Sequence, residues 1–238
     1  MDVEKQYLDG SYFARNPEWD RQDCIWKASL VKSILDESGI EIKSICEVGC
    51  GSGDILAQLR DYYPEYELTG YDISPQVKNF WDEHKVNNIH FHCGNFLDID
   101  HKYYDCILLI DVIEHLSNPF QFLNAIRERA KYFIFHFPLD LSVSTILREK
   151  SLLNARIKVG HIHYFTKGLA LAILRESGFN INLYRFTNAY LHIPNRSFKT
   201  RLASFPRRLF YLVNMDFGAR LLGGETLIAL AESSRNNN

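Results

Sequence analysis

Three glycines at alternate positions, Gly49, Gly51 and Gly53, have the spacing best suited to bind a ligand. Residues 45–48 before them have the apolar character of the end of a buried strand, and helical apolar spacing begins after residue 54. Because glycine has no Cβ, the backbone of such a loop can turn sharply and lie flat against a ligand. A strand, a glycine turn and a helix in this order predict a nucleotide-type site at the carboxyl end of a parallel sheet.

The spacing also indicates which kind of nucleotide the loop binds. A dinucleotide-binding loop has the form G-x-G-x-x-G and places a pyrophosphate on the helix N-terminus. Here Asp54 occupies the position of the third glycine in that form. A carboxylate there would repel a pyrophosphate, so we expect a ligand without phosphate and disfavour a nicotinamide dehydrogenase.

An acidic residue ends the next predicted strand, where the ribose of a bound nucleoside would lie. Asp72 follows the strand-like stretch 66–71 and lies 19 residues beyond Gly53. A carboxylate at that point can accept hydrogen bonds from both ribose hydroxyls, and Ile73 is placed to cover one adenine face. Because we expect Asp72 at a loop edge, we expect its replacement by alanine to weaken ligand binding with little loss of thermal stability.

Strand-like and helical stretches alternate through most of the chain. The stretch 104–110 is continuously apolar, as a central parallel strand should be, and Asp111 follows it. Further strands are expected at residues 88–94, 131–138, 179–187 and 226–233, with a helix at residues 166–178. This alternation predicts a doubly wound α/β fold.

The composition is that of one soluble globular domain, which we expect to span residues 1–238. The chain is 46% hydrophobic and carries a net charge of −2, so it has no general affinity for nucleic acid. We interpret its five cysteines as reduced, buried thiols. No basic-then-apolar signal opens the chain and no apolar run approaches the length of a membrane span, so we expect a cytoplasmic protein.

The motifs together resemble those of the class I S-adenosylmethionine (SAM) methyltransferases. The matching stretches are Glu47 to Gly53, Tyr71-Asp72-Ile73, Gly94-Asn95-Phe96 and Asp111-Val-Ile-Glu-His-Leu116. The chain is most similar to Rossmann-like enzymes that act on small molecules, including bacterial members of unassigned substrate. The resemblance covers residues 44–187 plus 225–233, and it implies a seven-stranded sheet whose last strand is antiparallel.

The resemblance also implies a cofactor and a set of residues that bind it. The cofactor would be SAM, with S-adenosylhomocysteine (SAH) as product. Gly49, Gly51 and Gly53 would approach the methionine part, Asp72 the ribose, Ile73 and Phe96 the adenine, and Asn95 its amino group; Glu47 and Asp111 complete the predicted cofactor site. The family usually has an aspartate where this chain has Asn95.

Methyl transfer to a hydroxyl needs an aligned acceptor and a base, and needs no covalent intermediate. Histidine is the natural base near neutral pH. His163, His161 and His115 all follow predicted strand ends, and we place them in this order of preference, although each could instead be structural. Glu114 and His115 with Asp111 could bind a divalent metal, but we expect none because Asp111 should face SAM.

Three segments lie outside the predicted core. Residues 1–40 are expected to form a helical extension, either packed on the sheet edge or acting as a lid whose aromatics close over the ligand pocket. Insertions are expected at residues 139–165 and 188–224. Six basic residues and one acid fall within residues 189–222. This segment could pack beside the site, capture an anionic substrate or contact a membrane surface.

The predicted function is methyl transfer to a small or lipid- or sugar-linked acceptor, at oxygen rather than nitrogen or carbon. The alternatives are a nucleic-acid methyltransferase that uses the basic segment, and a SAM-binding accessory protein without catalysis. We expect no nucleic-acid partner because the body of the chain is acidic.

Overall fold

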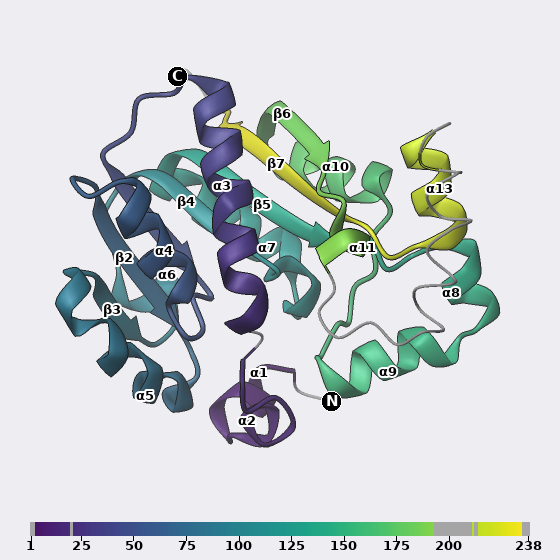
Figure 1. Ribbon diagram of the computed structural model, residues 1–238, viewed down its shortest axis with the longest axis horizontal. Helices are drawn as coiled ribbons and strands as arrows, with labels where there is room; N and C mark the ends of the chain where they lie inside the picture. The colour runs from purple at the N-terminus through teal and green to yellow at the C-terminus, as the bar shows by residue number, and fades with distance from the viewer. Residues whose placement is uncertain (1–2, 20, 193–210, 212–213, 235–238) are drawn as a thin grey trace.

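Seven strands form one sheet at the centre of the molecule (Figure 1). The computed structural model describes residues 3–19, 21–192, 211 and 214–234. The strands are β1 (Ser44–Val48), β2 (Glu67–Asp72), β3 (His90–Cys93), β4 (Tyr104–Ile110), β5 (Ala130–Pro138), β6 (Phe179–Phe186) and β7 (Thr226–Ser233). Their order is β3-β2-β1-β4-β5-β7-β6. The first five strands pair in parallel, and β7 is antiparallel to both β5 and β6. The predicted seven-stranded, mostly parallel, doubly wound fold is therefore confirmed.

Helices cover both faces of this sheet. The α-helices are α1 (Val3–Leu8), α2 (Ser11–Arg15), α3 (Cys24–Ser38), α4 (Asp54–Tyr62), α5 (Lys78–Trp81), α6 (Phe96–Ile99), α7 (Pro119–Ile126), α8 (Val143–Leu147), α9 (Lys150–Lys158), α10 (Lys167–Glu176), α11 (Ala189–His192) and α13 (Met215–Leu222). Short 3-10 helices are η1 (Arg21–Asp23), η2 (Pro75–Val77), η3 (Asp82–Asn87), η4 (Ile113–His115) and η5 (Arg127–Arg129). Helices α3, α4 and α5 pack on one face, and α7 and α10 pack on the other.

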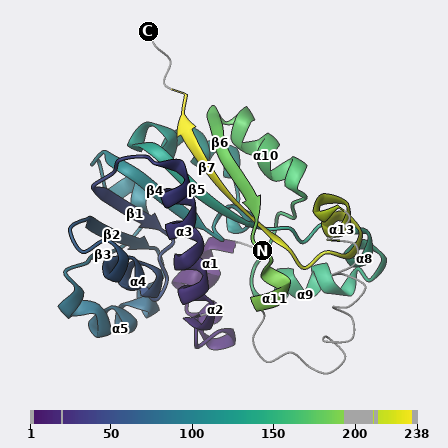
Figure 2. The ribbon, with the colours of Figure 1, turned by 45° about the horizontal axis from the view of Figure 1, so that its top comes forward.

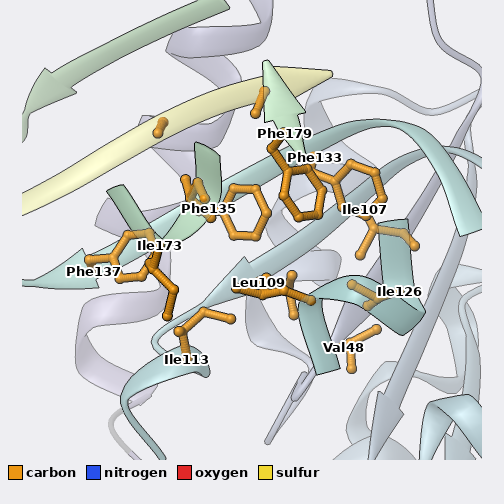
Figure 3. Close-up of a cluster of buried hydrophobic side chains, with 14 of the residues drawn as sticks. Val48, Ile107, Leu109, Ile113, Ile126, Phe133, Phe135, Phe137, Ile173 and Phe179 are labelled. Carbon is orange, nitrogen blue, oxygen red and sulfur yellow. The ribbon is translucent and has the colours of Figure 1, made fainter. Parts of the chain in front are cut away.

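The alternation of side chains along the central strands divides the core into two layers. Ile107 and Leu109 of β4 point to the α7 and α10 side, whereas Leu108 points to the α3 and α4 side. On the first side, the rings of Phe133 and Phe179 lie 4.9 Å apart, and Figure 3 shows these aromatics above the aliphatic residues of β4. Burial on both faces explains why the sequence of β4 is continuously apolar.

In the part of the two insertions that the structure describes, the regular elements are helices and not strands. Helices α8 and α9 lie within the 139–165 insertion, and α13 lies near the end of the 188–224 insertion. These three helices gather on one side of the sheet in both ribbon views (Figures 1 and 2). Within the described ranges, no helix combines the length and hydropathy needed to span a bilayer.

Candidate active site

The three predicted glycines form a left-handed loop directly after β1. Gly49, Gly51 and Gly53 have φ angles of 79°, 51° and 81°, a backbone region in which a side chain is strained. The N–H of Gly49 donates to the carbonyl of Tyr71 at 2.7 Å. The indole N–H of Trp81 donates to the carbonyl of Gly51 at 2.9 Å. These bonds hold the loop against the end of β2, at the edge of the sheet where the sequence places it.

Asp72 anchors this loop from the end of β2. It is only 7% exposed, its Oδ2 accepts from the N–H of Gly51 at 2.9 Å, and its Oδ1 accepts from Ser74 at 2.8 Å. Burial raises its pKa to about 6, although these two hydrogen bonds oppose the shift. The expected exposed position at a loop edge is wrong, because Asp72 is buried at the end of β2. We therefore now expect alanine at this position to cost stability, because it would leave two buried N–H groups without an acceptor. Each carboxylate oxygen still has a lone pair for a ribose hydroxyl.

A pocket of about 320 Å³ opens beside Asp72 and forms one half of the candidate cleft. Its lining includes Ile73, Asn95 and Phe96, so the structure brings the three predicted adenine-binding residues together. The side-chain oxygen of Asn95 accepts from the N–H of Leu97 at 3.1 Å, which leaves it one further lone pair. Phe96 is 1% exposed and forms part of the floor.

A second cleft half of about 380 Å³ lies on the other side of the glycine loop. It is lined by Glu47, which is 1% exposed and whose Oε2 has no hydrogen-bond partner among the described residues. Burial raises the pKa of Glu47 well above its usual value. The two halves adjoin, because five residues line both: Tyr12, Trp19, Gly49, Asp111 and His115.

Asp111 lies at the junction of the halves in a left-handed conformation, with φ 55°. Its Oδ2 is 2.9 Å from the ammonium of Lys27, and its Oδ1 is 2.6 Å from Nδ1 of His136. Burial alone would raise the pKa of Asp111, but His136 and Lys27 reverse that effect and hold it well below its usual range. Lys27 comes from α3 and His136 from β5. The sequence reasoning missed both, since no local pattern links them to Asp111.

Two of the three predicted histidines line the larger half. His161 lies with Nδ1 2.6 Å from Oδ2 of Asp140, a partner that the sequence reasoning also missed. His115 lies with Nδ1 3.1 Å from the carbonyl oxygen of Gly160 and 3.0 Å from the hydroxyl of Tyr7. The two imidazole rings are 5.0 Å apart.

His163 has a different environment. Its Nε2 lies 2.9 Å from the carbonyl oxygen of Leu116, and it lines neither cleft half. The backbone N–H groups of Ile162 and His163 both donate to the carbonyl of Glu114. This arrangement separates His163 from His161, which an extended segment would have placed on the same side.

Aromatic residues of the N-terminal segment lie directly on the glycine loop. A Cβ built on Gly51 would be 2.4 Å from the indole nitrogen of Trp19, and the ring of Tyr12 packs 4.9 Å from that of Trp19. Arg21 fixes the same segment to the helix after the loop, with its Nε 2.6 Å from Asp54.

The basic segment at 189–222 falls largely outside the described residues. Of its six basic side chains, the structure describes Arg220 on α13, which pairs with Asp216 at 3.2 Å. The predictions for substrate or membrane contact through Arg196, Lys199, Arg201, Arg207 and Arg208 therefore concern residues outside those described.

Comparison with known proteins agrees with this geometry. A protein of Bacillus cereus named malonyl-[acyl-carrier protein] O-methyltransferase is 28% identical over 146 residues, which are 58% of this chain and 51% of that protein. The chain thus matches about half the length of this relative.

Among solved structures, a methyltransferase in complex with an activator from Haloferax volcanii superposes with a TM-score of 0.63 at 16% identity, covering 98% of both chains. The magnesium protoporphyrin IX methyltransferase of Synechocystis, solved with bound SAH, gives 0.58 at 16% identity, covering 88% of this chain and 83% of that one. Both show the same fold. The model of the family described as "Methyltransferase domain" matches residues 21–183, and the chain belongs to this family of SAM-dependent methyltransferases.

Proposed function

We propose that this protein transfers the methyl group of SAM to an oxygen atom of a small acceptor, free or linked to a lipid or sugar. The observation that carries this proposal is the Asp140–His161 pair. A carboxylate oxygen can only accept from the imidazole, so the 2.6 Å contact places a proton on Nδ1 of His161 and leaves the lone pair of Nε2 available. The ring lines the larger cleft half, where it can accept a proton from a hydroxyl group.

The smaller cleft half suits the cofactor, and the larger cleft half suits the methyl acceptor. The smaller half contains the predicted adenine and ribose residues, so the adenosine of SAM would lie there. Its methionine would follow the glycine loop towards Glu47, and the methyl group would point into the larger half. The acceptor would then approach from the side of His161 and His115, in line for direct displacement.

The distribution of the three histidines supports His161 as the base over His163. His161 lines the acceptor half and has a carboxylate partner that orients its ring. His163 contacts a backbone carbonyl and would position the loop instead. His115 remains a second candidate because it lines the same half.

The name of the Bacillus cereus relative supports oxygen as the acceptor atom. It describes an enzyme that methylates an oxygen of an acyl group on a carrier protein. We propose an acceptor of this chemical kind, a hydroxyl or carboxylate oxygen on a small group. The N-terminal segment would act as the lid of the cleft, since Trp19 covers Gly51 and Arg21 is paired with Asp54.

The test is SAH formation from SAM with a panel of hydroxyl and carboxylate compounds, free and lipid- or carrier-linked. His161→Gln should lower turnover by about 10²–10⁴-fold with SAM affinity unchanged, and His163→Gln, the matched control, should have a much smaller effect. Equal loss in both variants would refute His161 as the base. Methylation of an oligonucleotide would favour the nucleic-acid alternative, and SAM binding without turnover on any acceptor would favour the accessory protein.

A further inference from the structure

A fully buried carboxylate without a hydrogen-bond partner among the described residues lies next to two histidines of the larger cleft half. Glu114, in η4, is 0% exposed, and neither of its side-chain oxygens has a hydrogen-bond partner among the described residues. A buried carboxylate without donors is costly, so an arrangement of this kind indicates a missing proton or a missing cation.

Two imidazoles converge on this carboxylate. The Nε2 atoms of His115 and His161 each lie 4.0 Å from Oε1 of Glu114. One potential ligand atom from each of the three side chains lies within 4.8 Å of the others. One histidine follows β4 directly, and the other closes the insertion after β5, so the tertiary fold creates the cluster.

The outer nitrogens of both rings already have acceptors. Nδ1 of His161 faces Asp140 and Nδ1 of His115 faces the carbonyl of Gly160, so both rings can hold their proton on Nδ1. Their Nε2 lone pairs are then available, 4.0 Å from Oε1 of Glu114. Metal-binding histidines almost always use one nitrogen for the metal and donate the other N–H to a carboxylate or a carbonyl.

We infer that Glu114, His115 and His161 form a binding site for a divalent transition cation such as Zn²⁺, Mn²⁺ or Co²⁺. Two imidazoles and one carboxylate suit these ions better than Mg²⁺ or Ca²⁺, which prefer oxygen ligands. Asp111, which the sequence pattern would have included, is instead engaged by Lys27 and His136. This inference revises the expectation that the protein binds no metal.

Both histidines line the acceptor half of the cleft, so a cation held by them would lie close to the acceptor. A cation and a proton exclude each other on Nε2 of His161. The cation would therefore replace His161 in activating the acceptor, by lowering the pKa of the oxygen that binds it. Only this consequence rests on the proposed methyl transfer, since cation binding itself does not depend on it.

The test uses the full-length chain, freed of metal by a chelator and titrated with Zn²⁺ by calorimetry and with Co²⁺ by visible absorption, without SAM or acceptor. We expect one Zn²⁺ per chain and a Co²⁺ spectrum typical of nitrogen and oxygen ligands. Glu114→Gln and His161→Gln should each weaken Zn²⁺ binding by at least about 100-fold, and Asp140→Asn by about 10–100-fold. His192→Gln, an imidazole in the same cleft half but outside the cluster, should bind Zn²⁺ as the wild type does.

Circular dichroism of each metal-free variant checks that it is folded. A wild type that binds no stoichiometric Zn²⁺ would overturn the inference. So would folded Glu114→Gln and His161→Gln variants that bind as tightly as the wild type. Methyl transfer by a chain that binds no cation overturns this inference while leaving the proposed function intact. Stoichiometric binding lost in both variants supports the inference even when no acceptor is methylated.

Discussion

Replacement of Asp72 by asparagine separates its expected role in SAM binding from its role in the loop. The carboxylate accepts from two backbone N–H groups, of Gly51 and Ser74, and has one lone pair per oxygen left for the ribose. An asparagine keeps the shape, but its NH₂ group would face one of those N–H groups as a second donor. We expect SAM to bind at least tenfold more weakly, because a hydrogen bond to a charged group contributes about 1.5–3 kcal/mol.

The raised pKa of Asp72 adds a pH dependence with a defined sign. The ribose hydroxyls donate to the ionised form, so SAM affinity should fall by up to about tenfold per pH unit below the pKa of about 6. Stability of the unliganded protein should change in the opposite sense. A folded pKa above the unfolded value of 3.8 gives a stabilisation that is complete below pH 3.8 and is lost as the pH rises to about 6.

Calorimetric titration with SAM between pH 5 and 8 measures the affinity, and urea unfolding of the ligand-free protein over the same range measures the stability. Asp72→Asn should bind SAM weakly with little pH dependence, and should unfold more easily by about 1–3 kcal/mol because a buried donor is left without an acceptor. Asp98→Asn, an exposed carboxylate on α6, is the control. Wild-type affinity in Asp72→Asn, or a wild-type affinity independent of pH around 6, would refute this reasoning.

Two further substitutions test the surroundings of the glycine loop. Gly51→Ala should displace Trp19, because the new Cβ would lie 2.4 Å from the indole nitrogen; SAM binding and tryptophan fluorescence should both change. Gly39→Ala is the matched control, since it also has a positive φ but no atom within 4 Å of the added Cβ, and it should cost only about 1 kcal/mol in urea unfolding. Lys27→Met should destabilise the protein by about 1.5–3 kcal/mol, because it removes a charged partner from the half-buried Asp111, which keeps only His136; a free energy of unfolding equal to that of the wild type would contradict this.

The gathering of the proposed cofactor-binding residues at one edge of the sheet was predictable because these residues lie at or just after strand ends. Gly49, Asp72, Asn95 and Asp111 each come within a few residues of a strand's carboxyl end, and parallel strands bring those ends to one edge. Local sequence patterns therefore suffice to predict that these residues lie close together, and the packing of the side chains need not be known. The expectation for Asp72 failed only in its burial, which depends on the loop of Gly51 folding over it.

The acceptor half was less predictable because tertiary contacts form it. The 139–165 insertion has no strand to fix its register, and its helices α8 and α9 are short. Which histidine lines the cleft therefore depends on how the insertion returns to the sheet. The backbone N–H groups of Ile162 and His163 fix the path of this segment by donating to the carbonyl of Glu114. Backbone hydrogen bonds of this kind cannot be predicted from residue types in the sequence.

The charges of the cleft explain why this loop departs from a dinucleotide-binding loop. Asp54 begins α4 where a pyrophosphate would otherwise lie, and Glu47, Asp72 and Asp111 line the cleft on either side. Carboxylates at these points oppose a phosphate group, yet the same charges favour a ligand with a positive sulfonium centre. Burial raises the pKa values of Glu47 and Asp72, so a positive centre bound beside them would favour their ionised forms. The choice of a sulfonium cofactor over a dinucleotide thus follows from the sign of the charges around one glycine turn. The fold itself is shared by proteins that bind either cofactor.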